Sequence, residues 1–110
     1  MTLSTHVLDI SRGTPASGIE VVLSVLEDGA RRELARAQTN GDGRIPSPFG
    51  GELRDGDYEL EFSAGAYFAA RSERAFYDRI PVRFRLASEA AHYHVPLLLS
   101  PWGYSTYRGS

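Results

Sequence analysis

Polar and apolar residues alternate with a period of two along most of the chain. In Tyr58–Phe62 aromatic and aliphatic residues alternate with glutamates. In Ile80–Leu86 the even positions are apolar, while Arg83 and Arg85 point the other way. Ile19–Leu26 is rich in β-branched residues and is apolar at its odd positions. A period of two predicts strands that bury one face.

Weaker patterns extend this prediction. Shorter strands are predicted at Ser4–Asp9, Leu34–Gln38 and Tyr104–Tyr107. His92–Leu99 also has a high β content, but it contains Pro96, which lacks an amide donor and so belongs on an edge strand or at a bulge. The alanine-rich segment Gly65–Phe76 departs from the pattern and predicts a short helix.

Turn sequences separate the predicted strands. They are Gly13–Pro15, Glu27–Gly29, Asn40–Gly43 and Arg54–Asp57. All of them supply glycine for positive φ or side chains for Asx-type turns. Many short strands joined in this way predict an antiparallel sandwich.

Length and composition limit the possible functions. The 110 residues, with a net charge of −2, predict one domain spanning residues 1–110. This charge gives no reason to expect nucleic acid or an anionic membrane surface as a partner. The lack of cysteine excludes disulfides and thiol catalysis. No apolar run is long enough to span a membrane and the N-terminus does not read as a secretory signal, so we expect a cytoplasmic protein.

The three histidines are the first residues that could carry chemistry. His92 and His94 lie two residues apart on one predicted strand, so their side chains project from one face. His6 lies on a distant strand that a sandwich could bring alongside. The imidazoles could act as a general base and a substrate orienter. They could also bind zinc with an open fourth position, or be surface or core histidines without a role.

The turn Asn40–Gly43 leads directly into Arg44. Such a turn is mostly a hairpin signal, but Arg44 could also serve as a planar cation for an anionic substrate or a developing oxyanion. The C-terminal segment Trp102–Ser110 is rich in aromatic residues, whereas chain ends usually fray. An aromatic end predicts a tail held in a core, an interface or a site.

Four separated parts of the chain form recognisable motifs: Leu3–Asp9 followed by Gly13–Ala16, the central Thr39–Arg44, His92–Pro101, and the terminal Tyr104–Ser110. Together these motifs resemble those of the transthyretin-like hydroxyisourate hydrolases. The resemblance covers essentially the whole chain in the right order. The final tetrapeptide Tyr107–Ser110 is the feature that separates these hydrolases from transthyretin, the hormone carrier of the same fold. One departure is Ile45, which stands where the family often has cysteine.

The resemblance implies an all-β, transthyretin-like (prealbumin-like) fold, a two-sheet antiparallel sandwich of about eight strands with one short helix. It implies a homotetramer, built as a dimer of dimers, with active sites at the dimer–dimer interface. In such an assembly a neighbouring chain would hold the aromatic tail.

The resemblance also implies a reaction, the hydrolysis of 5-hydroxyisourate to 2-oxo-4-hydroxy-4-carboxy-5-ureidoimidazoline in urate catabolism. The implied catalytic residues are His6, Arg44, His94 and Ser110, and the implied substrate-binding residues are His6, Arg44, His92 and Tyr107. Either His6 or His94 would activate water, and Arg44 would stabilise the oxyanion. No cofactor or metal is implied.

Three alternatives stay open. The first is a non-catalytic, transthyretin-like carrier of small aromatic ligands, against which the histidine pair and the terminal tetrapeptide argue. The second is a structural β-sandwich module, which would share the Gly-x-Pro opening and the Asn-x-Asp-Gly turn but lack the histidines. The third is a zinc-dependent hydrolase.

Overall fold

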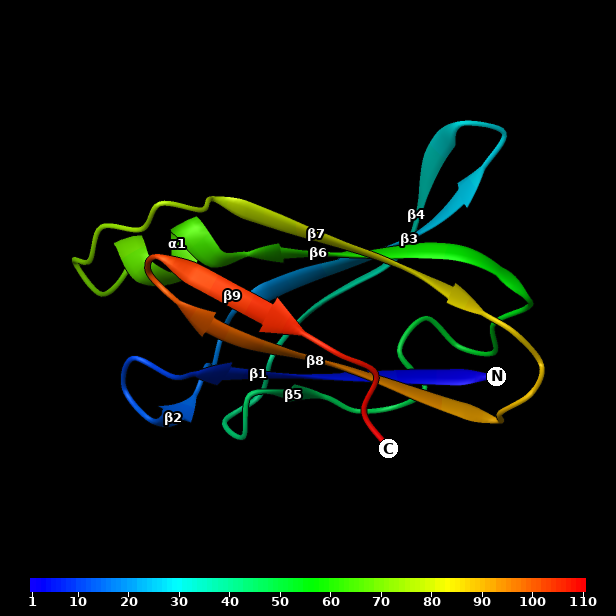
Figure 1. Ribbon diagram of the computed structural model, residues 1–110, viewed down its shortest axis with the longest axis horizontal. Helices are drawn as coiled ribbons and strands as arrows, with labels where there is room; N and C mark the ends of the chain where they lie inside the picture. Colours follow the sequence, from blue (N-terminus) through cyan, green and yellow to red (C-terminus); the bar gives the residue numbers. More distant parts are fainter.

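Two β-sheets pack face to face around the hydrophobic core in the computed structural model, which describes residues 1–110 (Figure 1). The elements are β1 (Thr2–Asp9), β2 (Thr14–Pro15), β3 (Glu20–Glu27), β4 (Ala30–Gln38), β5 (Arg44–Ile45), β6 (Gly56–Ser63), α1 (Ala64–Ala69), β7 (Arg79–Leu86), β8 (His92–Ser100) and β9 (Gly103–Thr106). This all-β sandwich with one short helix confirms the predicted fold class. No helix combines the length and the apolar character needed to cross a membrane.

The five-stranded sheet, which we call the site sheet, has the order β2-β1-β8-β9, with β5 also paired to β1. The second sheet has the order β4-β3-β6-β7. Every predicted strand is present. The strands β2 and β5 were not predicted, because each has two residues and so leaves no periodic pattern in the sequence.

One strand pairing differs from the expected antiparallel arrangement. β1 and β8 run parallel (Figure 1). Their register places Thr2 opposite His92 and Ser4 opposite His94. Parallel neighbours need a long connection, and here the chain passes through the whole second sheet between the two strands. The first and eighth strands therefore lie side by side at the centre of the site sheet.

The prediction that Pro96 lies at a sheet edge or a bulge was wrong, because β8 lies between β1 and β9. The carbonyl of Pro96 faces the β9 side, where it accepts a hydrogen bond from Thr106 Oγ1 at 2.7 Å. In a strand, the amide nitrogen of a residue points to the same side as its carbonyl. The β8–β9 ladder begins only at Leu97, so the missing N–H of Pro96 removes no ladder hydrogen bond.

The helix is shorter than the predicted Gly65–Phe76, and α1 ends at Ala69. Ser72 adopts a positive φ of 59°, a left-handed backbone conformation that cannot continue a right-handed helix. The amides of Ser72 and Glu73 turn back to the carbonyls of Ala69 and Phe68, so the last turn is closed before the segment reaches Phe76.

Strict alternation along β1 separates a core face from an outer face. The odd residues Leu3, Thr5, Val7 and Asp9 are buried, and the even residues are half-buried. In β8, Tyr93, Val95, Leu97 and Leu99 are buried on the core side. The even residues of both strands therefore face outward from the site sheet, and this face carries the three histidines.

Candidate active site

Three adjacent strands place the predicted basic residues on the outer face of the site sheet. His6 in β1 pairs directly with Arg44 in β5. On the other side of β1, His6 pairs with Pro96, so His94 is the diagonal neighbour of His6 on the same face. Directly opposite and diagonal side chains on one sheet face lie within reach of each other. The structure therefore gathers His6, Arg44, His92 and His94.

The turn before β5 holds Arg44 opposite His6. The Asn40 side-chain oxygen accepts hydrogen bonds from the amides of Asp42 and Arg44, at 2.9 and 3.0 Å. Gly43 has a φ of 73°, and a Cβ there would stand 2.5 Å from the carbonyl oxygen of Val7. Only glycine permits this close approach of the turn to β1, so the sequence of the turn fixes the position of Arg44.

Two hydroxyl groups on β1 bind the two histidines of β8. Thr2 Oγ1 lies 2.8 Å from His92 Nδ1. Ser4 Oγ lies 3.1 Å from His92 Nε2 and 2.8 Å from His94 Nδ1. Both imidazoles are thus held by β1, and Nε2 of His94 is left for other partners.

The pKa of His94 is lowered from its usual 6.5, first because burial disfavours the charged imidazolium. The positive guanidinium of Arg44 lowers it further, and His6 and His92 act in the same direction. A hydrogen bond with the Ser4 backbone opposes these effects. His94 is therefore a neutral imidazole at neutral pH, which is the form that can accept a proton.

The C-terminal tail is anchored on β8 of its own chain, and the expectation that a neighbouring chain also holds it stays a prediction. The Gly109 amide donates to the His94 carbonyl at 2.7 Å. The Arg108 guanidinium stacks on the Tyr93 ring, 4.7 Å from its centroid. Ser110 follows Gly109 and is exposed, so the tail brings Ser110 to the neighbourhood of His94.

Tyr107 lies elsewhere. Its side chain is 57% exposed, and together with Arg108 and Tyr93 it lines a cavity of about 300 Å³ between β7 and β8. The structure therefore brings together His6, Arg44, His92 and His94, with Ser110 nearby, but it does not bring Tyr107 to the histidines within one chain.

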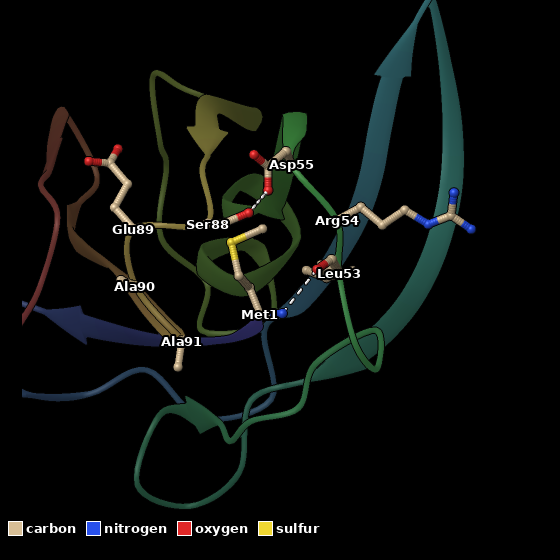
Figure 2. A pocket seen from close by; sticks show the side chains of 8 residues that line it. All are labelled: Met1, Leu53, Arg54, Asp55, Ser88, Glu89, Ala90 and Ala91. Carbon is tan, nitrogen blue, oxygen red and sulfur yellow. Dashed lines mark hydrogen bonds between the residues drawn. The ribbon is translucent and has the colours of Figure 1, made fainter.

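Another cavity, of about 490 Å³, lies beside the start of β1, around Met1 (Figure 2). There the Met1 ammonium donates to the Leu53 carbonyl at 3.0 Å, and Ser88 donates to Asp55. Met1 and Asp55 are thus occupied by structural contacts. None of the cavities is lined by His6, Arg44 or His94, so these side chains form an open surface on a single chain.

The sequence reasoning missed Thr2, Ser4, Asn40 and Gly109 as residues that hold the site together. A signal for two of them was present, since Thr2, Ser4 and His6 alternate on one strand and must share a face. The His, Cys, Asp and Glu side chains form no group of three or more that could hold a metal ion.

Comparison with known proteins adds a second line of evidence. The model of the HIUase/Transthyretin family matches residues 3–109. A 5-hydroxyisourate hydrolase of Mesorhizobium japonicum is 51% identical, over 98% of this chain and 91% of the relative.

Solved structures agree in fold. The 5-hydroxyisourate hydrolase of Klebsiella pneumoniae superimposes with a TM-score of 0.88 and 43% identity, covering 100% of both chains. Sea bream transthyretin in complex with thyroxine superimposes with a TM-score of 0.92 but only 30% identity, covering 99% of this chain and 95% of that one. The backbone is thus common to a 5-hydroxyisourate hydrolase and a thyroxine-bound transthyretin, while the sequence is more similar to the hydrolase.

Proposed function

The chain belongs to the HIUase/Transthyretin family, and from this premise we propose that it hydrolyses 5-hydroxyisourate to 2-oxo-4-hydroxy-4-carboxy-5-ureidoimidazoline in urate catabolism. The observation that carries the proposal is the gathering of His6, Arg44 and His94 on one outer face, with His94 kept neutral by its surroundings. A neutral base beside a fixed cation is the combination that hydrolysis of a cyclic amide requires.

In the proposed mechanism, Nε2 of His94 removes a proton from water as the oxygen attacks a ring carbonyl carbon. Negative charge develops on the carbonyl oxygen, and Arg44 stabilises it with a charge-assisted hydrogen bond. The tetrahedral intermediate then collapses, the adjacent C–N bond breaks, and the leaving nitrogen takes the proton from His94. The ring opens and His94 returns to its neutral form.

The remaining predicted residues orient the reactants. His6 lies opposite Arg44 and beside His94, where it can hydrogen-bond the substrate. His92 extends the same surface. Ser110 follows the residue anchored on His94, so its hydroxyl and the terminal carboxylate can position water or the polar edge of the ring. We assign Tyr107 to substrate binding through the tail of a neighbouring copy.

We also propose that the protein is a homotetramer, a dimer of dimers with its sites at the dimer–dimer interface. Support comes from the open surface around His6, Arg44 and His94, because a small substrate needs more enclosure than a flat sheet face gives. Exposed aromatic rings, Trp102 at 67% and Phe76 at 69%, also favour contact with another chain. Light scattering would test this proposal, and a monomer that is fully active would contradict it.

A carrier of small aromatic ligands is the second candidate function, since a thyroxine-bound transthyretin shares the fold. The lower identity to that protein and the histidine surface favour the hydrolase. A carrier needs no neutral base facing a cation, whereas hydrolysis does.

The test is an absorbance assay on pure protein with freshly generated 5-hydroxyisourate, compared with the spontaneous decay of the substrate. We expect strong acceleration by the wild type and a loss of roughly 100-fold in Arg44→Ala or His94→Ala. Arg74→Ala is the matched control, because Arg74 is exposed and lies outside the site. Decay at the spontaneous rate with the wild type would reject the proposed function.

A further inference from the structure

The side chains on the outer face of β1 and β8 form one continuous chain of hydrogen bonds. It runs from His94 through Ser4 and His92 to Thr2. The parallel register creates it, because Thr2 stands opposite His92 and Ser4 stands opposite His94. Ser4 is the central member, since its single hydroxyl contacts both imidazoles.

The chemistry of a hydroxyl restricts how this chain can be arranged. A serine hydroxyl has one proton to donate, and its lone pairs can accept. Ser4 therefore cannot donate to both imidazoles at once. At least one histidine must therefore carry a proton on the nitrogen that faces Ser4. The imidazole that receives the Ser4 proton accepts, the other imidazole donates, and this choice sets the tautomer of each neutral ring.

The two possible tautomers of His94 differ in catalytic competence. A neutral imidazole has one N–H and one nitrogen with a lone pair. When Nδ1 carries the proton and donates to Ser4, Nε2 has the free lone pair and can take a proton from water. When Ser4 donates to Nδ1 instead, Nε2 carries the proton and His94 cannot act as the base.

We propose that Ser4 is a positioning residue that holds His94 in the tautomer with the proton on Nδ1. In this arrangement His94 Nδ1–H donates to Ser4 Oγ, Ser4 donates to His92 Nε2, and His92 Nδ1–H donates to Thr2 Oγ1. Each imidazole thus keeps one proton, and all hydrogen bonds run in one direction. The inference rests on the proposed function for the role of His94 as the base.

This arrangement also suits the imidazolium that forms during the reaction. When Nε2 takes a proton, the bond from Nδ1–H to Ser4 keeps its geometry and becomes charge-assisted, which strengthens it. Apart from a hydrogen bond with the Ser4 backbone, which raises the pKa of His94, its charged neighbours disfavour positive charge, because Arg44 on β5, His6 on β1 and His92 on β8 all lower that pKa. Ser4 is therefore the partner that stabilises the transition state without reorganisation.

The first test is the tautomer itself, measured by ¹⁵N NMR on histidine-labelled protein without substrate, above the pKa of His94. We expect Nδ1 of His94 to be protonated and Nε2 to be unprotonated in the wild type. In Ser4→Ala we expect the signal to move towards the Nε2–H tautomer that free imidazole side chains prefer. A wild-type His94 protonated on Nε2 would overturn the proposal, and the assay needs no enzymatic activity.

The second test is kinetic. Ser4→Ala should lower kcat by about tenfold, the scale of one hydrogen bond that strengthens in the transition state, and change KM by less than about twofold. Ser4→Thr keeps the hydroxyl and should restore most of kcat. Ser17→Ala, an exposed serine in a loop, is the matched control, and circular dichroism checks that each variant folds.

The two proposals can fail separately. A wild type that binds no substrate or hydrolyses none would reject the proposed function, while the NMR measurement still decides the tautomer. Unchanged kcat in Ser4→Ala together with an unchanged His94 tautomer would reject the positioning role of Ser4 in an active enzyme.

Discussion

Gly109 lies directly against the His94 ring, so closely that a Cβ at position 109 would stand 2.6 Å from His94 Cδ2. The same residue donates its amide to the His94 carbonyl. The tail thus packs on the histidine that we propose as the base, and only a residue without a side chain permits this contact.

Gly109→Ala should therefore lower kcat by about tenfold or more, because either the ring or the tail has to move and a displaced base loses alignment. The β-sheet signal in circular dichroism should stay the same, since the contact lies on the surface. Gly103→Ala is the control: its φ is not positive and its nearest neighbour is 4.0 Å from the added Cβ. Wild-type rates in Gly109→Ala would contradict a tight tail contact.

Arg44 should control the pH dependence of activity. Because the pKa of His94 is lowered from 6.5, the neutral base persists below that pH, and kcat/KM should fall only at a lower pH. Arg44→Gln removes the positive charge, so the pKa of His94 rises and the acid limb should move to higher pH, in addition to the loss of rate. The pH profiles of kcat/KM measure this shift. An acid limb at the same pH in both proteins would mean that another group titrates.

Deletion of Tyr107–Ser110 should abolish activity and leave a folded β protein. The deletion removes Ser110 and the Gly109 contact, and it takes away the Arg108 guanidinium that stacks on Tyr93. None of the core residues lies in the deleted segment, so the sandwich should remain. Activity and circular dichroism of the truncated protein check both expectations, and a truncated protein that keeps its turnover would exclude a catalytic role for the tail.

Asp9 should make stability depend on acid pH. Burial alone would raise the pKa of this carboxyl, but hydrogen bonds from Ser11, Arg12 and Tyr67 outweigh burial, and the pKa is lowered from 3.8. A lowered folded-state pKa adds stability above the unfolded-state value and loses it as the pH falls through the folded-state value.

Asp9→Asn should thus lower the free energy of unfolding at neutral pH by about 2 kcal/mol, the scale of hydrogen bonds to a buried charged group. The difference from the wild type should shrink as the pH falls from 3.8 through the lowered folded-state pKa, below which the wild-type carboxyl is protonated in both states. Urea unfolding at both pH values measures it. An equal difference at both would show that the charge of Asp9 contributes nothing.

Most of the fold follows from the sequence because strands with one buried face leave a period of two. Tyr58–Phe62 and Ile80–Leu86 show this pattern, and they lie in β6 and β7. The parallel pairing of β1 with β8 could not be predicted, because local patterns carry no information on which distant strands become neighbours. The prediction that Pro96 lies on an edge strand or at a bulge failed for a related reason. Pro96 fits inside the sheet because the ladder between β8 and β9 begins one residue later, at Leu97.

The sequence predicts most of the residues of the candidate site, but it does not predict the hydrogen bonds and contacts between them. The spacing of His92 and His94 indicates a shared face, and the resemblance to a family points to His6 and Arg44. The bridging role of Ser4 requires the register between β1 and β8, which is a property of the tertiary structure. The contact of Gly109 with His94 likewise depends on where the tail runs, and a glycine near a chain end carries no signal of its own.

The parallel pairing of β1 with β8 also affects how the newly synthesised chain folds. Ser4 and His94 are 90 residues apart in the chain, so a ribosome must release almost the entire polypeptide before the two can meet. Contacts between such distant segments slow folding. Until β8 is available, the edge of β1 that pairs with it stays unpaired. The proposed catalytic surface is therefore complete only after β8 has been synthesised.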